Sequence, residues 1–221
     1  MSDVELLVSD DPGAELARRL VEAVRAGVTV ALSGGSGPRG AYERAAAEAP
    51  DWSRSELWLV DDRCVPPDDE RSNFRLVRET ILDRLERPPR AVHRIEGERP
   101  PEEAAARYDA ALDGVRFDLA VMGIGPDGHT ASLFPNAPQL DERERRAVVA
   151  EPGLEPFVPR VTTTIPVLAA TELMAYLVTG GGKAEAARRA FAGPPSRDTP
   201  ASLVRGRRTV AILDRDAAAR M

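Results

Sequence analysis

A histidine and an aspartate two positions apart follow the most apolar strand that the sequence predicts. His129 and Asp127 lie in the segment Gly123–Pro135 (GIGPDGHTASLFP), directly after a predicted central strand at Phe117–Met122. An imidazole exchanges protons near neutral pH, and a neighbouring carboxylate can hold its ring in one orientation. The pair therefore predicts a general base in a tight turn. The other histidine, His93, falls inside a predicted strand, where a structural role is favoured.

The same segment offers an alternative interpretation as a nucleotide site. Residues 123–128 match the G-x-G-x-x-G pattern of dinucleotide-binding folds, and Glu151 could be the later acidic residue. That pattern requires a long helix that begins within it. Pro135 and Pro138 interrupt such a helix, so a dinucleotide site is disfavoured.

A glycine-rich loop is predicted between a strand and a helix at Ser33–Pro38 (SGGSGP). The backbone N–H groups of Gly34 and Gly35 can approach an anion closely, and Ser36 adds a hydroxyl donor. No Gly-Lys-Ser/Thr sequence closes the loop, and Pro38 stands where a nucleophile elbow needs its last glycine. The loop predicts a phosphate site, with a plain flexible turn as the alternative.

Charged residues leave the next predicted strand as Asp61, Asp62 and Arg63, with Ser72 and Asn73 downstream. Carboxylates and a guanidinium at the end of a strand can orient the hydroxyls of a sugar and bind its anionic group. A solvated acidic turn is the alternative for this segment.

Two further basic residues suit an anion site. Lys183 is the single lysine among 30 basic residues, and it follows Gly180–Gly182 at the start of a predicted helix. Arg160 stands beside the hydroxyl side chains of Thr162–Thr164. Both residue types suit phosphate binding. Arginine is abundant in this chain, so a plain surface role is the favoured alternative for Arg160 alone, whereas it is not favoured for Lys183.

Short apolar runs alternate with helical stretches along the chain. This alternation predicts an α/β fold of the Rossmann-like, doubly wound type, with a mostly parallel sheet and helices on both of its faces. We expect residues 1–221 to form a single domain. Ligands of such sheets bind beyond the carboxyl ends of the strands. The predicted strands are Val4–Val8, Val28–Leu32, Leu57–Val60, Val92–Ile95, Phe117–Met122, Ala147–Ala150, Val161–Thr164, Met174–Val178 and Thr209–Leu213. The predicted helices are Pro12–Ala26, Pro38–Ala49, Asn73–Leu85, Pro101–Leu112 and Lys183–Phe191, the first capped by Asp10 or Asp11.

Composition excludes several classes of partner. The net charge is −6 with no basic block, so nucleic acid is not expected, and no apolar run is long enough for a membrane span. The N-terminal residues lack the pattern of a signal peptide, and Cys64 is the single cysteine, which suits the cytoplasm. Metal-ligand spacing is absent. We therefore expect no metal, and no obligate protein partner is evident.

Together these motifs resemble the 6-phosphogluconolactonase family, within the wider glucosamine-6-phosphate isomerase/lactonase group. The resemblance rests on segments in the family's order along the chain: Ser33–Pro38, Asp61–Pro66, Gly123–Pro135, Arg160–Thr164 and Gly180–Lys183. Two positions depart from the family pattern. Gly37 stands where threonine is usual, which removes a hydroxyl, and Asp62 stands where glutamate is usual, which shortens the reach of the carboxylate.

The resemblance implies a cofactor-independent hydrolysis of 6-phosphogluconolactone to 6-phosphogluconate, in the oxidative pentose phosphate pathway. A sugar-phosphate lactone is then the small-molecule partner. His129 would take a proton from the attacking water while Asp127 orients its ring, and Arg63 would stabilise either the substrate or the oxyanion, a choice that stays open. The implied phosphate site comprises Gly34, Gly35, Ser36, Arg160 and Lys183, and Asp61 joins the catalytic group.

Two alternative functions follow from the same fold. An amino-sugar phosphate isomerase/deaminase resembles this pattern but carries a glutamate where this chain has Phe134. A non-catalytic sugar-phosphate sensor would need an additional DNA-binding domain, whereas the predicted sheet begins at about residue four. Both alternatives are disfavoured.

Overall fold

Seven parallel strands form the main sheet of the computed structural model, which describes residues 4–153 and 155–221. Residues 1–3 and 154 of the expected domain lie outside the described part. The strand order is β1-β10-β9-β6-β2-β3-β5, and every pairing is parallel. The strands are β1 (Val4–Val8), β2 (Thr29–Leu32), β3 (Glu56–Leu59), β5 (Ala91–His93), β6 (Leu119–Met122), β9 (Leu173–Val178) and β10 (Arg208–Leu213). The predicted parallel sheet is confirmed, and β6 is its middle strand, as its apolar sequence indicated.

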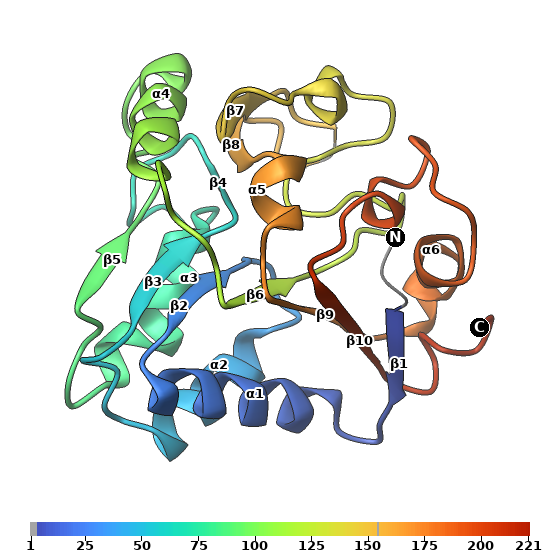
Figure 1. Cartoon of the computed structure of the whole chain (residues 1–221), viewed down its shortest axis with the longest axis horizontal. Coiled ribbons are helices and arrows are strands. Elements are labelled where there is room, and N and C mark those ends of the chain that lie inside the picture. The colour runs from blue at the N-terminus through green and yellow to red at the C-terminus, as the bar shows by residue number, and fades with distance from the viewer. Residues whose placement is uncertain (1–3, 154) are drawn as a thin grey trace.

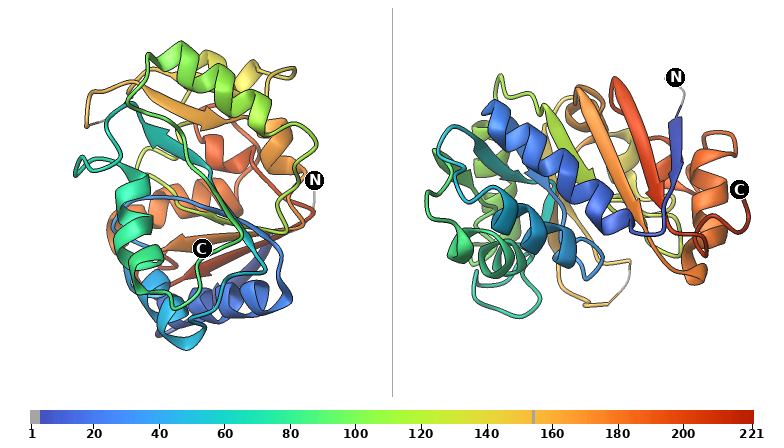
Figure 2. Two further views of the ribbon diagram at one scale, coloured as in Figure 1. Left: turned by 90° about the vertical axis from the view of Figure 1, so that its left-hand side faces the viewer. Right: turned by 90° about the horizontal axis from the view of Figure 1, so that it is seen from below.

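Helices cover both faces of this sheet, as a doubly wound fold requires. In Figure 1, α1 and α2 lie below the strands, whereas α4 and α5 lie above them. The view from below in Figure 2 shows α1 crossing the strands. The helices are α1 (Pro12–Ala26), α2 (Arg39–Glu48), α3 (Asn73–Thr80), α4 (Pro101–Ala111), α5 (Ile165–Ala169) and α6 (Ala184–Phe191). No helix in the described residues is both long and apolar enough to span a membrane.

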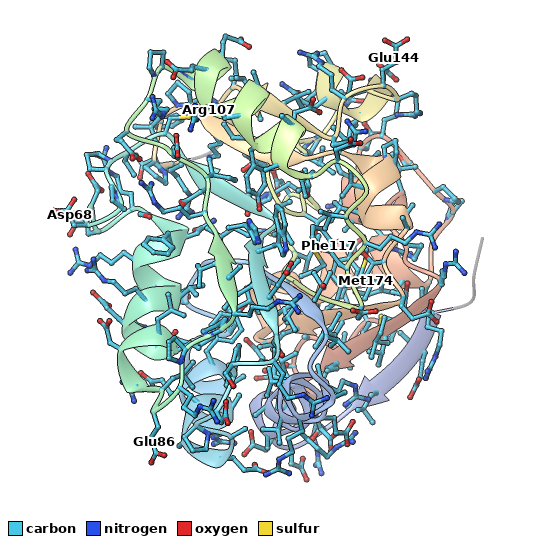
Figure 3. All side chains as sticks on the ribbon, turned by 60° about the vertical axis from the view of Figure 1, so that its left-hand side comes forward. Asp68, Glu86, Arg107, Phe117, Glu144 and Met174 are labelled. Carbon is cyan, nitrogen blue, oxygen red and sulfur yellow. The ribbon has the colours of Figure 1, made fainter. Side chains whose placement is uncertain are left out.

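Alternate residues of the strands feed two apolar cores, one on each face. Leu57 and Leu59 of β3 pack with α1 and α2, whereas Trp58 between them packs with α4 on the other face. Strand residues alternate in direction, so a strand buried on both sides is apolar throughout. Figure 3 shows the outcome for side chains: Phe117 and Met174 lie inside, and the labelled charged residues lie at the periphery.

A second, smaller sheet carries part of the site. Its antiparallel order is β4-β8-β7, with β4 (Asp61–Arg63), β7 (Ala147–Ala150) and β8 (Arg160–Thr163). Ala147 and Val161 of this sheet share one buried cluster with Trp58 of the main sheet. The segments of β7 and β8 are strands, as their sequences predict, whereas β4 was expected to be a loop and the second sheet was not expected. Three charged residues give no apolar alternation, so β4 has no signal of its own in the sequence.

Helix boundaries follow local chemistry. Asp11, rather than Asp10, caps α1 and accepts a hydrogen bond from the backbone N–H of Ala14 at 2.9 Å. Gly27 ends α1 in the left-handed conformation, with φ 75°. The predicted helix at 73–85 is shorter than expected: α3 ends at Thr80, and a 3-10 turn, η1 (Leu82–Arg84), follows it. The other 3-10 turns are η2 (Pro138–Asp141), η3 (Gly181–Lys183) and η4 (Pro200–Ser202).

The chain changes direction in the sheet between β2 and β6. After β2 it runs outward through β3 to β5, then returns to β6 on the opposite side of β2. Such a switch leaves a crevice beyond the carboxyl ends of the two neighbouring strands. The loops that start at Ser33 and Gly123 leave these two ends.

Candidate active site

One cavity of about 250 Å³ opens at this switch and gathers residues from all the predicted motifs. Eight of its lining residues were predicted from the sequence: Gly34, Gly35, Ser36, Asp61, Arg63, His129, Arg160 and Lys183. The ninth predicted residue, Asp127, lies behind His129 and contacts its ring. The structure therefore brings together residues that are far apart in the sequence, from Gly34 to Lys183.

His129 and Asp127 form the hydrogen-bonded pair that their spacing predicted. Nδ1 of His129 lies 2.6 Å from Oδ1 of Asp127. Burial acts to raise the pKa of the Asp127 carboxyl, but the hydrogen bond and charge of His129 outweigh it and leave that pKa below its usual value. With Nδ1 engaged by a carboxylate, Nε2 is the ring nitrogen left for proton transfer. The His129 side chain is 20% exposed, so a substrate in the cavity can reach it.

The turn that carries this pair is held closed by its own backbone. The N–H of Gly125 donates to the His129 carbonyl oxygen at 2.9 Å, and Oγ1 of Thr130 donates to the Gly123 carbonyl oxygen at 2.8 Å. A Cβ on Gly125 would lie 2.1 Å from Nδ1 of His129, so only glycine leaves room for the ring. No α-helix begins within this turn, which excludes the dinucleotide fingerprint.

Phe134 lies between His129 and Arg160. Its ring centroid lies 5.0 Å from that of His129, and the guanidinium carbon of Arg160 lies 5.1 Å from the Phe134 centroid. Both distances allow favourable aromatic contacts. An apolar ring thus occupies the place where the deaminase pattern carries a glutamate.

The glycine-rich loop lies against the cavity on the other side of the switch. Gly35 has φ 88°, a left-handed conformation that favours glycine. A Cβ on Gly34 would lie 1.9 Å from Oδ1 of Asn73, so this glycine makes room for a side chain of α3. The hydroxyl of Tyr42 donates to the Ser33 carbonyl oxygen at 2.8 Å and ties the start of the loop to α2.

Asp61 is buried and held in place by hydrogen bonds. Oγ of Ser132 donates to its Oδ2 at 2.6 Å, and Nδ2 of Asn73 donates to its backbone carbonyl oxygen at 2.9 Å. The backbone N–H of Ser132 donates to Oγ1 of Thr162 at 3.2 Å. These bonds join β4, β8 and the His129 turn. Asp61 is also the only carboxylate among the described residues that line the cavity.

Asp62 faces away from the cavity and serves α3. Its carboxylate accepts hydrogen bonds from the backbone N–H groups of Asn73 at 2.6 Å and Phe74 at 3.0 Å, at the helix start. Burial raises the pKa of Asp62 to about 6, against the opposing effect of these donors. Replacing glutamate by the shorter aspartate at this position therefore affects how the start of α3 is held, and not a contact in the cavity.

Arg63 and Arg160 are direct neighbours across the antiparallel pair β4 and β8. Like charges opposite each other on neighbouring strands destabilise a sheet. Burial, followed by the charge of Arg63, lowers the pKa of the Arg160 guanidinium. The guanidinium groups of Arg63 and Arg160 line the same cavity and repel each other. An anion bound between them would reduce this repulsion.

Lys183 approaches the cavity from the opposite side, at the start of α6. Burial lowers the pKa of its ammonium group. This ammonium group makes no hydrogen bond or ion pair with any residue that the structure describes. Gly180, with φ 89°, turns the chain after β9, and its N–H donates to Oδ2 of Asp214 at 2.8 Å. A partly buried ammonium group without a partner among these residues suits an anionic ligand.

His93 lies outside the cavity, in agreement with its predicted structural role. Its ring stacks on Trp58 with centroids 3.7 Å apart. Across residues 4–153 and 155–221, no group of three His, Cys, Asp or Glu side chains is placed to hold a metal ion.

Sequence reasoning missed the contacts of Asn73 and Ser132. Asn73 lines the cavity and hydrogen bonds to both Asp61 and Arg63. Its position next to Ser72, downstream of the charged segment, was the available signal. Ser132 lies within the histidine motif, but its bond to Asp61 spans 71 positions and has no local signature.

Known proteins share both the sequence and the fold. A model of the family described as glucosamine-6-phosphate isomerases/6-phosphogluconolactonase matches residues 7–212. The 6-phosphogluconolactonase of Homo sapiens is 38% identical over 215 residues, covering 89% of this chain and 83% of that protein. That of Aggregatibacter actinomycetemcomitans is 34% identical over 201 residues, covering 86% and 85%.

Solved structures agree with this relationship. The 6-phosphogluconolactonase structure from Thermotoga maritima superposes with a TM-score of 0.82 at 29% identity, covering 97% of this chain and all of that chain. A monomeric glucosamine-6-phosphate deaminase also matches, with a TM-score of 0.84 at 19% identity, which is a likeness of fold alone. The resemblance found in the motifs is thus confirmed over nearly the whole length. The chain belongs to the glucosamine-6-phosphate isomerase/6-phosphogluconolactonase family.

Proposed function

We propose that His129 is the general base of this protein and that the cavity beside it holds a sugar phosphate. The reaction follows from the relatives: the protein is an enzyme that hydrolyses the lactone of 6-phosphogluconate, in the pentose phosphate pathway. One observation supports the catalytic assignment above all: Nδ1 of His129 lies 2.6 Å from Oδ1 of Asp127. The His129 ring lines a cavity that is also lined by two arginines and a lysine.

The proposed reaction needs one proton carrier. Nε2 of His129 takes a proton from water as the water oxygen forms a bond to the lactone carbonyl carbon. The bond from that carbon to the ring oxygen then breaks, and the ring oxygen receives the proton from the imidazolium. Asp127 fixes the ring and stabilises its charged form between the two transfers.

The phosphate lies, in this proposal, between the glycine-rich loop and the basic residues. Gly34, Gly35 and Ser36 offer polar groups from one side, and Arg160 and Lys183 offer charges from the others. Because Arg63 is the cross-strand neighbour of Arg160, we assign it to the same anion rather than to the carbonyl oxygen. Asp61, held by Ser132 and Asn73, orients substrate hydroxyls.

A deaminase is the second candidate, and Phe134 disfavours it. Ring opening and isomerisation of an amino sugar would require a further acid near His129, and an aromatic ring packs there instead.

We also propose that residues 1–221 form one domain and that the protein works in the cytoplasm. The shared buried cluster of the two sheets supports the first proposal, and the free thiol of Cys64 suits the second.

Hydrolysis of freshly generated 6-phosphogluconolactone, measured against the spontaneous rate, tests the function. His129→Ala is expected to lower kcat by about 10²–10⁴-fold, the usual contribution of a positioned base. Unphosphorylated gluconolactone is the control, since it lacks the group that the basic residues bind. A folded His129→Ala variant with wild-type turnover would remove His129 from the mechanism.

A further inference from the structure

Asn73 occupies a fixed place in the wall of the cavity. It is the first residue of α3 and is 3% exposed. Its backbone N–H donates to Oδ1 of Asp62, and Oγ of Ser72 caps the same helix by accepting from the N–H of Arg75 at 3.3 Å. The start of α3, and with it the side chain of Asn73, is therefore anchored independently of any ligand.

The side-chain amide of Asn73 is oriented by two partners of opposite kind. Nδ2 donates to the backbone carbonyl oxygen of Asp61 at 2.9 Å and faces its Oδ1 at 3.3 Å. Oδ1 accepts from Nη1 of Arg63 at 2.8 Å. A carbonyl oxygen can only accept and a guanidinium can only donate, so the amide fits in one orientation.

The same side chain supports the glycine-rich loop. Because a Cβ on Gly34 would meet Oδ1 and Cγ of Asn73 at about 2 Å, the loop backbone lies directly on the amide. Asn73 thus contacts the loop, Asp61 and Arg63, which are three parts of the cavity that come from separate segments of the chain.

The neutrality of Asn73 matters to the charge of the site. A carboxylate in its place would neutralise Arg63, face Asp61 with a like charge and repel an incoming anion. The amide accepts from Arg63 while leaving the positive charge available. Nη1 of Arg63 also donates to the Arg71 carbonyl oxygen at 2.7 Å, which leaves the charge equally intact.

We propose that Asn73 is a positioning residue that holds the Arg63 guanidinium opposite Arg160 and so sets the affinity of the cavity for the substrate anion. This inference rests on the proposed role of the cavity as a sugar-phosphate site. Asn73 acts through Arg63, and its removal is predicted to matter only while Arg63 is present.

A double-mutant cycle tests this dependence. The variants are Arg63→Ala, Asn73→Ala and the two combined, with kcat and KM measured on 6-phosphogluconolactone and Kd measured for 6-phosphogluconate. Loss of a hydrogen-bond partner of a charged group predicts that Asn73→Ala lowers kcat/KM by roughly 10- to 100-fold, mainly through KM. In the Arg63→Ala background the same change is expected to cost less than about threefold, because coupled residues are not additive.

Asn73→Asp keeps the volume of the side chain and reverses its electrostatic effect, so its loss in affinity is expected to exceed that of Asn73→Ala. Ser72→Ala is the matched control: it removes the cap of the same helix and the bond from Oγ of Ser72 to Asp62, and it lowers the melting temperature. The Asp62 carboxylate still holds the backbone N–H groups of Asn73 and Phe74, so the bonds of Asn73 to Arg63 and Asp61 stay in place. Its kinetic constants should stay near those of the wild type.

Several outcomes would overturn the inference. These are wild-type constants for Asn73→Ala, effects of the two single changes that multiply fully in the double variant, and a loss in Ser72→Ala as large as in Asn73→Ala. If the wild type fails to accelerate lactone hydrolysis, the proposed function is wrong, yet the cycle in Kd for 6-phosphogluconate still decides the role of Asn73.

Discussion

At the scale of single residues, the site depends on how closely a histidine ring can approach the backbone. Gly125 faces the His129 ring at a distance that a methyl group would fill. The Asp127 carboxylate contacts the same ring from the side and accepts a hydrogen bond from the backbone N–H of His129 at 3.2 Å. The His129 ring is thus oriented by the Asp127 carboxylate and by the lack of a side chain at Gly125.

Gly125→Ala is predicted to abolish most turnover with little change in stability. The added Cβ would lie 2.1 Å from Nδ1 of His129 and 2.6 Å from Oδ1 of Asp127, so the ring must leave its place, and a side chain can move at small cost. We expect kcat to fall by about 10²-fold or more, as for loss of a positioned base.

Gly40→Ala is the comparison for this change, because a Cβ there meets no atom within 4 Å and Gly40 does not line the cavity. It should retain its turnover. Melting temperatures of both variants show whether folding is affected. If the two variants had equal turnover, Gly125 would not be needed to keep the His129 ring in position.

Lys183 predicts a particular pH dependence of anion binding. Burial lowers the pKa of its ammonium group, so in the free protein the charge is lost at a lower pH than for an exposed lysine. Affinity for 6-phosphogluconate should therefore fall as the pH rises through this lowered pKa, before the value of about 10.4 that is usual for lysine. The measurement is calorimetric titration at successive pH values.

Lys183→Arg provides the contrast, since arginine stays protonated across this range. Its affinity at neutral pH falls to some extent through altered geometry, but the decline at high pH should disappear. Parallel declines in the wild type and the variant would show that a group other than Lys183 titrates.

At the scale of secondary-structure elements, the loop between β2 and α2 has space for a side chain at Gly37. A Cβ on Gly37 meets no atom within 4 Å, and its backbone is not left-handed. The family pattern has threonine at this position. The departure therefore removes a hydroxyl near the proposed phosphate site, without any steric reason in the fold.

Gly37→Thr is predicted to strengthen substrate binding. One added neutral hydrogen bond contributes about 0.5–1.5 kcal/mol, which corresponds to a decrease in KM of roughly 2- to 10-fold. Gly37→Ala is the control, because alanine stiffens the loop as threonine does but adds no hydroxyl. We expect it to raise the free energy of unfolding without changing KM. If alanine lowers KM as much as threonine does, the hydroxyl makes no contact with the substrate.

Elements with strong periodicity could be predicted from the sequence, and elements defined by a distant partner could not. The span of α1 is as predicted because its cap, its apolar face and Gly27 all act locally. The strand β4 exists because Asp62 pairs with Val161 nearly a hundred positions later. The same difference applies to the site: the Asp127–His129 pair is local, whereas the bond from Ser132 to Asp61 is not.

At the scale of the whole molecule, the cavity joins the two sheets. It takes Gly34 and His129 from the loops of the main sheet, Arg63 and Arg160 from the antiparallel sheet, and Lys183 from the start of α6. These residues meet only in the folded chain. An anion that binds them therefore binds the native state and not the unfolded state.

This arrangement predicts that 6-phosphogluconate stabilises the entire fold as one unit. At a concentration of 100 times Kd, a ligand specific to the native state contributes about 2.7 kcal/mol. For a chain of this length that corresponds to a rise in melting temperature of roughly 5–11 °C. Differential scanning calorimetry measures the shift and also shows whether a single transition moves, as the proposed single domain requires.

Gluconate, which lacks the phosphate, is the ligand control, and Arg160→Ala and Lys183→Ala are the protein controls. Gluconate should leave the melting temperature nearly unchanged, and each variant should lose most of the shift. A shift of equal size with gluconate would place the binding energy outside the phosphate site. Two separate transitions, of which the ligand moves only one, would mean that the antiparallel sheet and the main sheet unfold independently, and the single-domain proposal would be wrong.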